Sequence, residues 1–557
     1  MITRETQTIG PRRNIRAKRV LFVFNSNEHL GVTWLSATLK AAGHDVRLAF
    51  DPQPFRGEPL VRIEPLVRLL DCTDHIVKTA KEFDPDVICY SCYTDNFRWM
   101  LATASAIKRA LPRTVNVFGG VHVLAAPEAT MSYPQVDAVV LGESFEALPE
   151  LVAAVEMGHV PPGIPNVWSR DGNEIVRNSI RPYFDDLDCL PIRDFTLFYD
   201  QVPAMETNYL TMTSLGCPQS CSFCSVEMYN RTYAEIGDRR RVRRRSVEHV
   251  MAELRAVKAR GRVRQVSFMD AIFTLNRNWL EDFLDAYREE IGLPFWAYTY
   301  PGLVNRELAE GLAGAGCRMI TMGVQSGSRK IRRSSMNRSE TGDRIQGTAD
   351  TLRSAGIQLA VDKIIGSPGE TAADRKQDIE LFRSLHPDRL LTFPLSYYPG
   401  TSLVPQGVDA GIFTEEEASR LEHGDLSPQP TRGPMIEAPL AYRAQRILLA
   451  MIPLPGGHRR SLDRWVWRLA HLPGSEMVER FLVALNALRI GDTKFTYLVR
   501  LTIAQMWMSI HRRIRPGAGR PDPRRNASQV SDSIDLRREV ESIAGNPPSD
   551  TMTRTSG

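Results

Sequence analysis

The sequence contains no run close to the roughly 18 consecutive apolar residues that a membrane-spanning helix needs, so no transmembrane segment is expected. Its first 20 residues, MITRETQTIGPRRNIRAKRV, carry charges but no apolar core, so a secretory signal peptide is not expected either. Cysteine is sparse, and five cysteines follow no regular spacing; they are Cys72, Cys89, Cys92, Cys189 and Cys317. We therefore expect no disulfide framework and a reduced, cytoplasmic compartment.

A strong charge of either sign is missing as well. The formal net charge is +5 over 557 residues, which gives no reason to expect a nucleic-acid partner. Hydrophobic residues make up 43% of the chain and charged residues 24%, which is the composition of ordinary soluble globular proteins. A chain of this length suggests two to four domains.

Residues 18–157 alternate short apolar runs with helical patterns. The runs RVLFVF, DVRLAF, DVICYSC, TVNVFGG and DAVVLG are typical of buried strands, and VTWLSATLKAAG and FRWMLATASAIKRAL are typical of helices. This order predicts an α/β domain with a doubly wound, Rossmann-like parallel sheet. Ligands of such sheets bind at the carboxyl ends of the strands, where this chain has NSNEHLG (25–31), SCYTDN (91–96), GGVH (119–122) and GESFE (142–146).

A second alternating region begins after a connecting segment. Residues 158–208 are rich in proline and turn residues, and we interpret them as a linker between domains. In 209–404, six candidate strands from YLTMTSL to RLLTFPLSY alternate with helical patterns, which predicts a full or partial βα (TIM-like) barrel with its chemistry at the carboxyl-end loops. Residues 405–514 have a helical pattern, and the Pro-, Gly-, Ser- and Arg-rich tail at 515–557 is predicted to be disordered.

The helical segment at 462–510 is rich in aromatic residues and admits three interpretations. Its aromatic side chains can pack in the core or between domains. They can form a lid that excludes water from a hydrophobic substrate. A third option is shallow membrane contact by WMSIHRRIR.

Three of the eight cysteines lie within LGCPQSCSFC (215–224). Cys217, Cys221 and Cys224 follow the first predicted barrel strand on one short loop, so they can converge on one iron–sulfur cluster. A four-iron cubane with three protein thiolates leaves one iron open, much as a catalytic zinc keeps an open position. A structural zinc site would need a fourth ligand, and the nearest histidine, His249, lies in a predicted helix. A disulfide would leave one thiol unpaired.

The spacing C-x3-C-x2-C, with the aromatic Phe223 before the last cysteine, resembles the signature of the radical S-adenosylmethionine (SAM) enzymes. The resemblance implies that the three cysteines ligate a 4Fe–4S cluster and that SAM binds its open iron. In that family the reduced cluster cleaves SAM to a 5′-deoxyadenosyl radical, which removes hydrogen from an unactivated carbon. It also implies an external electron donor such as a flavodoxin or ferredoxin.

Four further motifs match this family in order along the barrel: VSFMDAIFTLN, MGVQSGS (322–328), IIGSPGET (364–371) and YYPGTSL (397–403). The match implies that SAM is held by Phe223, Asp270, Gln325, Ser326 and Gly366. Two positions depart from the family pattern. Ala271 stands where related enzymes often carry a second acid, and Gln325 replaces the usual glutamate, although an amide still hydrogen-bonds hydroxyls.

The first domain, with its GGVH and GE loops, resembles the cobalamin-binding domain of one radical SAM subclass, and the whole resemblance covers roughly residues 18–405. It implies cobalamin contacts at Asn27, Glu28, His29, Ser91, Thr94, Gly119, Gly120, His122, Gly142 and Glu143. Some cobalamin domains ligate cobalt through the histidine of D-x-H-x-x-G. The loop NEHLGV has neither the aspartate nor the glycine spacing, so we expect cobalt without a protein nitrogen ligand, and His122 lining the corrin pocket.

The run DRRRVRRR (238–245) contains six arginines. Arg243 and Arg245 are its candidates for binding the SAM carboxylate or an acidic substrate, while most of the run is expected to be solvated. A nucleic-acid site would interleave aromatic residues for stacking, and this run has none.

The resemblance favours methylation of an unactivated carbon, or less commonly phosphorus, of a small molecule or natural product. One SAM would methylate cobalamin, a second would supply the radical, and methylcobalamin would donate its methyl group to the substrate radical. An oxidative cyclase or rearrangement enzyme is an alternative with the same cofactors. A tRNA methylthiotransferase would need a second cysteine trio, and a non-catalytic cobalamin sensor would not use the first. The sequence identifies no catalytic residue beyond the cluster ligands and no substrate.

Overall fold

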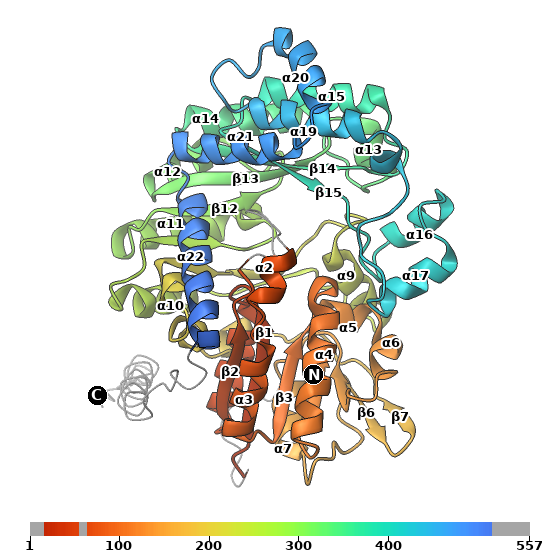
Figure 1. Ribbon diagram of the computed structural model, residues 1–557. Helices are drawn as coiled ribbons and strands as arrows, with labels where there is room; N and C mark the ends of the chain where they lie inside the picture. Colours follow the sequence, from red (N-terminus) through yellow and green to blue (C-terminus); the bar gives the residue numbers. More distant parts are fainter. Residues whose placement is uncertain (1–15, 55–63, 515–557) are drawn as a thin grey trace, which may run out of the picture.

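The structure, a computed structural model, describes residues 16–54 and 64–514. Two large sheets lie one below the other in Figure 1, and the C-terminal helices cover the upper one. The predicted disordered tail at 515–557 lies outside the described residues. In the part of the chain that is described, no helix is both long and apolar enough to cross a bilayer.

The first sheet has the order β2-β1-β3-β4-β5-β6-β7. Its first five strands are parallel, which confirms the predicted doubly wound fold; they are β1 (Arg19–Asn25), β2 (Asp45–Asp51), β3 (Val87–Ser91), β4 (Val115–Gly119) and β5 (Ala138–Val140). The strands form because their apolar runs are buried between helices on both faces. The strand order reverses between β1 and β3, and ligands of such sheets bind at this switch point.

The segment 158–208 is more than the linker that its composition predicts. It contributes two antiparallel strands to the first sheet, β6 (Val167–Asp171) and β7 (Glu174–Arg177). This hairpin turns at Gly172, whose φ of +59° suits glycine. The flanking prolines hid two strands of five and four residues. Only the remainder crosses between domains, through η1 (Leu187–Cys189), α8 (Thr196–Tyr199) and η2 (Pro203–Thr207).

Short helices connect the strands of the first domain. They are α1 (Leu30–Ala41), α2 (Glu64–Leu69), α3 (Thr73–Phe83), α4 (Thr94–Ala110), α5 (Val121–Ala125), α6 (Pro127–Met131) and α7 (Ala147–Ala154). α1 contacts α7, and α3 contacts α4. Right-handed crossovers explain this pairing. Connections that lead toward one edge of the sheet lie on one face, and connections that lead toward the other edge lie on the opposite face.

The second sheet is an open, six-stranded partial barrel, as the sequence predicts. Its strands run in the order β15-β14-β13-β12-β11-β8, and every neighbouring pair is parallel. The strands are β8 (Asn208–Thr211), β11 (Gln265–Phe268), β12 (Phe295–Thr299), β13 (Cys317–Gln325), β14 (Gln358–Ile365) and β15 (Arg389–Pro394). Because all six are parallel, their carboxyl-end loops gather at one edge.

The barrel helices begin at clear capping residues. Ser246 accepts a hydrogen bond from the His249 amide at 3.1 Å, and Thr371 with Asp374 forms a capping box. The helices of this region are α9 (Ser225–Glu235), α10 (Val247–Ala259), α11 (Arg277–Glu290), α12 (Arg306–Gly314), α13 (Arg329–Ser334), α14 (Gly342–Ser354) and α15 (Ala372–Leu385), with η3 (Phe273–Leu275).

A small antiparallel ribbon separates the first barrel strand from the cysteines. It pairs β9 (Ser214–Gly216) with β10 (Val242–Arg244), so the cysteines follow β9 rather than β8 directly. Gly216 has a φ of +93°, and a Cβ there would lie 2.1 Å from the carbonyl oxygen of Arg241. Only glycine fits this turn into the cysteine loop.

The region 405–514 is helical, as predicted. Its helices are α16 (Leu403–Asp409), α17 (Glu415–Glu422), α18 (Pro434–Glu437), α19 (Pro439–Met451), α20 (Asp463–Ala470), α21 (Glu476–Arg489) and α22 (Thr493–Ile514), with η4 (Arg460–Leu462). Figure 1 shows α22 running back from the barrel toward the first domain. There, Gln505 donates to the Ser26 carbonyl and Arg512 to the Phe50 carbonyl.

Candidate functional site

The three cysteines lie at the carboxyl-end edge of the barrel. Cys217 and Cys224 are half-buried, Cys221 is 7% exposed, and Cys224 is the residue that precedes α9. The loop is fixed from outside by side-chain amides. Asn230 donates to the Cys217 carbonyl at 3.0 Å, and Asn337 donates to the Ser220 carbonyl at 2.7 Å. The three thiols therefore lie on one loop, and their convergence on one cluster stays a prediction.

Each cysteine sulfur has a nearby donor. Burial raises the pKa of all three thiols, that of Cys224 to about 11. Amide hydrogen bonds from Gln219 to Cys217 and from Val226 to Cys224 act in the opposite direction. Such donors favour the thiolate, which is the form that ligates metal.

The donor to Cys221 is Arg338, whose Nη1 lies 3.6 Å from Sγ. Arg338 is 6% exposed and is held by Glu340 at 2.8 Å and by the Gly323 carbonyl at 2.7 Å. Sequence reasoning missed this residue, because nothing in MNRSE shows that its charges become buried beside a cysteine more than a hundred positions away.

The donor set fits an iron–sulfur cluster better than a single ion. Within residues 16–54 and 64–514, no three His, Cys, Asp or Glu side chains lie close enough together to hold one metal ion. A zinc ion needs four ligands about 2.0–2.3 Å from one centre, whereas a cubane spreads its thiolates over different irons. The half-buried loop, its sulfur donors and the lack of a fourth ligand therefore suit a cluster with one open iron.

Asp270 lies at the end of β11 and is fully buried. Its carboxylate accepts hydrogen bonds from the Thr213 amide at 2.9 Å, the Thr213 hydroxyl at 2.6 Å and the Ser214 hydroxyl at 2.6 Å. Thr213 connects β8 to β9, and Ser214 is the first residue of β9, which leads into the cysteine loop. Asp270 thus fixes the entry to that loop, and its contact with SAM stays a prediction.

The other predicted SAM residues line the same edge. Gln325 ends β13 at a bulge with a φ of +66°, and Ser326 is buried with its hydroxyl donating to Asp378 at 3.0 Å. Gly366 follows β14, and a Cβ there would lie 2.6 Å from the Met435 side chain. Phe223 packs against the cluster of apolar residues around Tyr397. Their roles toward SAM stay predictions.

His29 lies at the switch point of the first sheet. Its Nδ1 accepts the Val32 amide at 3.1 Å, so it caps α1, and its Nε2 lies 3.4 Å from the Ser91 hydroxyl. Burial lowers the pKa of His29 to about 4, so the ring is neutral. A ring that accepts at Nδ1 carries its proton on Nε2 and has no lone pair left for cobalt. The geometry supports the expectation that His29 is not a cobalt ligand.

The neighbouring strand ends hold several of the other predicted cobalamin residues. Thr94 begins α4, and its hydroxyl lies 3.1 Å from Nδ1 of the buried His122. Gly120 has a φ of +98°, and a Cβ there would lie 2.7 Å from the Cys92 amide nitrogen. The glycine pair therefore lets β4 approach the end of β3 closely. Asn27 is exposed at the same edge.

The carboxylate of Glu143 contacts the barrel. It pairs with Arg243 of β10 at 2.8 Å and accepts the Phe184 amide at 3.0 Å. Gly142 lets this loop meet α9, since a Cβ there would lie 2.4 Å from the Tyr233 hydroxyl. The side chain of Glu143 therefore joins the two domains, and its contact with cobalamin stays a prediction.

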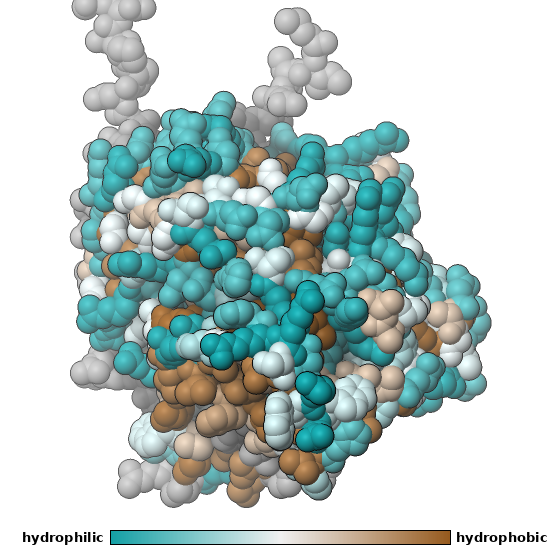
Figure 2. Space-filling model, turned by 90° about the horizontal axis from the view of Figure 1, so that it is seen from above, coloured by the Kyte–Doolittle hydropathy of each residue, from teal (hydrophilic) through white to brown (hydrophobic). Residues whose placement is uncertain are grey.

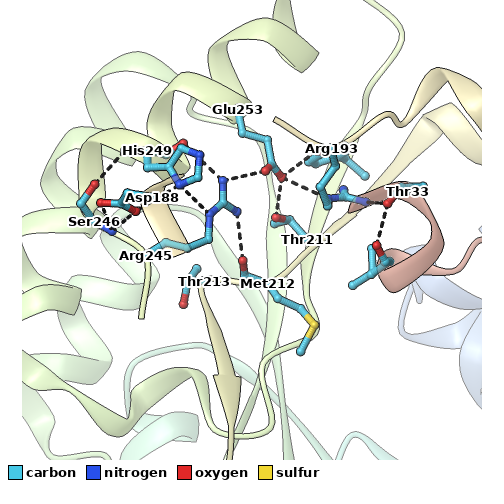
Figure 3. A network of polar contacts seen from close by, with 12 residues as sticks. Thr33, Asp188, Arg193, Thr211, Met212, Thr213, Arg245, Ser246, His249 and Glu253 are labelled. Atoms are coloured by element: carbon cyan, nitrogen blue, oxygen red, sulfur yellow. Dashed lines mark hydrogen bonds and ion pairs between the residues drawn. The ribbon is translucent and has the colours of Figure 1, made fainter. Parts of the chain in front are cut away.

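Glu28 takes part in a second connection between the domains. Its carboxylate lies 3.3 Å from Arg193, and both side chains are buried. Arg193 also reaches Glu253 of α10 at 3.5 Å and the Thr33 hydroxyl at 2.9 Å, as Figure 3 shows. Burial raises the pKa of Glu28 to about 7, against the opposing effect of Arg193.

Glu253 is the centre of this network (Figure 3). It accepts hydrogen bonds from Thr211 at 2.7 Å and Arg245 at 2.7 Å. Burial acts to raise the pKa of Glu253, but Arg245 and Arg193 outweigh it and hold the pKa at about 2. Arg243 and Arg245 are therefore paired with the protein's own Glu143 and Glu253. The prediction that these two arginines bind an anion of SAM or substrate is not supported by this pairing.

Further contacts hold the two strand-end edges against each other. A Cβ at Gly400, after β15, would lie 3.0 Å from Cβ of Ala125 in α5. The Tyr398 hydroxyl donates to Asp95 of α4 at 3.2 Å. A doubly wound domain whose ligand-binding edge meets the three-cysteine edge of a partial barrel defines an enzyme that brings two cofactors together.

Family models agree with this class. The radical SAM superfamily model matches residues 211–382, and the B12 binding domain model matches residues 22–152. The chain belongs to the cobalamin-dependent radical SAM enzymes, and its cofactors are a 4Fe–4S cluster, SAM and cobalamin.

Known proteins resemble most of the chain. An uncharacterized methyltransferase of Pyrococcus horikoshii, PH0819, is 28% identical over 378 residues, which cover 67% of this chain and 77% of that protein. The cytidylyl-2-hydroxyethylphosphonate methyltransferase of Streptomyces wedmorensis is 23% identical over 441 residues, 70% and 79% of the two chains. The radical SAM methyltransferase TsrM of Kitasatospora setae shares the fold, with a TM-score of 0.61 at 18% identity over 84% of this chain and 96% of that one.

Proposed function

We propose that the enzyme is a methyltransferase that acts on an unactivated carbon, or less commonly on phosphorus, of a small molecule. Two curated relatives that cover about two thirds of the chain are named methyltransferases, and one is named for a phosphonate substrate. The observation that carries the proposal is the contact between two edges: the strand ends of the first sheet, where cobalamin would bind, and the barrel edge that carries the three cysteines. Three pairs of residues make this contact: Glu143 with Arg243, Glu28 with Arg193, and Ala125 with Gly400.

The bound cofactors would supply one-electron cleavage of SAM at the cluster and methyl transfer through cobalt. The chain's own residues bind, orient and shield them. Cys217, Cys221 and Cys224 would ligate the cluster, and Arg338 would keep a positive charge beside Cys221. Asp270 fixes the entry to the cysteine loop. His29, neutral and already hydrogen-bonded at both ring nitrogens, would line the cobalamin site without ligating the metal.

The proposal is tested by the products of SAM. Anaerobically reconstituted enzyme that contains cobalamin would be given SAM and dithionite, and 5′-deoxyadenosine and S-adenosylhomocysteine would be quantified by mass spectrometry. Methyl transfer requires both products, with S-adenosylhomocysteine depending on bound cobalamin. An oxidative cyclase or rearrangement enzyme would give 5′-deoxyadenosine without S-adenosylhomocysteine, and that result would overturn the proposal. Protein with Cys221→Ala should give neither the cluster nor 5′-deoxyadenosine.

The alternative of a tRNA methylthiotransferase has little support in the first domain. Cys72, Cys89 and Cys92 are each at most 4% exposed and belong to its core. Cys92 packs with its sulfur 3.3 Å from the Met100 sulfur. The three cysteines also lie on different elements, with Cys89 within β3, Cys92 after β3 and Cys72 before α3, instead of on one loop like the cluster motif.

We further propose that the enzyme works in a reduced cytoplasm with an electron donor such as a flavodoxin or ferredoxin. All eight cysteines are free, which suits that compartment. The cluster must receive electrons one at a time, and flavodoxins and ferredoxins provide them. Replacing dithionite by a reduced flavodoxin should sustain 5′-deoxyadenosine formation.

A further inference from the structure

Helices α20 and α21 expose large apolar side chains to solvent on their outer side. We call this surface the C-terminal apolar face; it comprises Trp465, Trp467, Met477, Phe481, Leu485 and Leu488. Trp465 is 68% exposed, Phe481 66% and Leu488 65%. Figure 2 views this end of the molecule from above and shows brown, hydrophobic side chains gathered among teal, hydrophilic ones. A gathering of exposed large side chains marks an interaction surface more often than scattered single ones do.

The exposure does not come from poorly packed helices. α20 buries Val466 and Ala470 against Ala444, Ile447 and Leu448 of α19. Trp465 and Trp467 each lie about 100° around α20 from the buried Val466, so they occupy its two flanks, and both are exposed. In α21, Met477, Phe481, Leu485 and Leu488 recur at helical spacing and form one exposed apolar side. Of the three interpretations of the aromatic segment, core packing therefore does not hold for the two tryptophans of α20.

The charged residues of the region 459–489 are mainly arginines. Asp463, whose side chain is 42% exposed, pairs with Arg383 of α15, and the buried Glu479 pairs with Arg446 of α19 at 2.6 Å. Five arginines of this region are exposed; they are Arg459, Arg460, Arg464, Arg468 and Arg480. The guanidinium of Arg468 lies 5.4 Å from the centre of the Trp465 ring. The outer surface is therefore both apolar and cationic.

We propose that the C-terminal apolar face docks on the surface of an anionic lipid bilayer. Tryptophan and phenylalanine insert at the boundary between headgroups and acyl chains, while arginines attract anionic headgroups. Since no described helix is long and apolar enough to cross a bilayer, the contact is peripheral. A second copy of the chain fits this face less well, because a two-fold interface would set the five exposed arginines against the same five of its partner.

The test is cosedimentation of the full-length holoenzyme with vesicles, once of phosphatidylcholine alone and once with phosphatidylglycerol added. We expect binding to the anionic vesicles that weakens at high salt, and a blue shift of tryptophan emission on binding. The double variant Trp465→Ser/Phe481→Ser should reduce partitioning by about tenfold or more, because two inserted aromatic rings are lost. Arg464→Gln/Arg468→Gln should remove most of the preference for anionic vesicles.

The matched control is Met157→Ser, which changes a side chain that is 99% exposed on the first domain. It should bind vesicles like the wild type. Every variant is first checked for unchanged iron content and circular dichroism. Equal partitioning of wild type and Trp465→Ser/Phe481→Ser, or no binding to either kind of vesicle, would overturn the proposal. A concentration-dependent dimer that the same variant abolishes, without vesicle binding, would assign the face to self-association instead.

Discussion

Glu143 of the cobalamin domain accepts a hydrogen bond at 2.8 Å from Arg243 of the barrel, across 100 positions of sequence. The two side chains are 15% and 8% exposed. Arg243 also stacks over the Tyr183 ring at 4.4 Å and donates to the Phe184 carbonyl at 2.7 Å. One ion pair therefore ties together the first sheet, the crossing segment and the ribbon that leads to the cysteines.

Removing either partner of this pair should weaken the docking of the domains. We expect Glu143→Gln and Arg243→Gln each to lower the free energy of unfolding by about 1–3 kcal/mol, because each leaves a largely buried charge without its partner. The double variant should be less destabilised than the sum of the two. Urea unfolding of the four proteins at neutral pH measures this double-mutant cycle.

The control for this cycle is the pair between Glu128 and Arg177, which is held at 2.7 Å but is about half exposed on both sides. Its variants Glu128→Gln and Arg177→Gln should change stability by less than about 1 kcal/mol. Equal effects at the two pairs would contradict the role of Glu143 in docking.

Glu28 should make stability depend on pH. Burial raises the pKa of its carboxyl to about 7, from 4.5 for an ordinary glutamate. Between these two values the folded state keeps a proton that the unfolded state releases, so the contribution of Glu28 is lost as pH rises through this window. The charged and titratable groups around Glu28 are Arg193, Glu253, Tyr199 and Tyr497. As pH rises from 4.5 to 7, the free energy of unfolding of Glu28→Gln should increase relative to that of the wild type by on the order of 2–3 kcal/mol. Urea unfolding of both proteins across this range measures the difference.

Glu253 serves as the control, because its pKa is shifted in the opposite direction from that of Glu28. Its pKa is held at about 2 by Arg245 and Arg193 against the effect of burial, so it stabilises the fold above its unfolded pKa. That contribution disappears as pH falls toward 2. Glu253→Gln should therefore be most destabilised at neutral pH and approach the wild type in acid. If Glu28→Gln showed the same pH profile, the assignment of a raised pKa to Glu28 would be wrong.

His29→Ala should leave the environment of cobalt unchanged. Because both ring nitrogens already have partners, the absorbance of bound cobalamin and the electron paramagnetic resonance of its cobalt(II) form should match the wild type. Loss of the cap on α1 should cost about 1 kcal/mol. His29→Asn, which can still cap the helix, should restore that stability. A change in nitrogen coupling to cobalt(II) would identify His29 as a ligand.

Asp270→Asn should damage the cysteine loop before any effect on SAM is measured. The amide keeps one acceptor oxygen for groups that now donate to a carboxylate, so we expect a loss of about 1–3 kcal/mol. Iron bound per chain after reconstitution should fall. Asp285→Asn, at a side chain that is 70% exposed on α11, should retain full iron content. Normal iron content in Asp270→Asn with weaker SAM binding would support direct contact instead.

Local sequence patterns predicted most of the architecture. The parallel strands, the cysteine loop and the helical C-terminal region follow from apolar periodicity and from motifs that lie within a few residues of each other. The hairpin at 167–177 was missed because its strands are short and surrounded by prolines. The roles of Glu28 and Glu143 were missed because their partners lie 165 and 100 positions away. A sequence shows which residues carry charge, but folding decides which charges meet.

The most direct test of the central claim is a Mössbauer spectrum of the full-length enzyme reconstituted with ⁵⁷Fe without oxygen. The account expects one 4Fe–4S cluster per chain, with one iron site that shifts when SAM is added, and no cluster in Cys221→Ala. A wild-type spectrum without a cubane, together with bound zinc in place of iron, would contradict it.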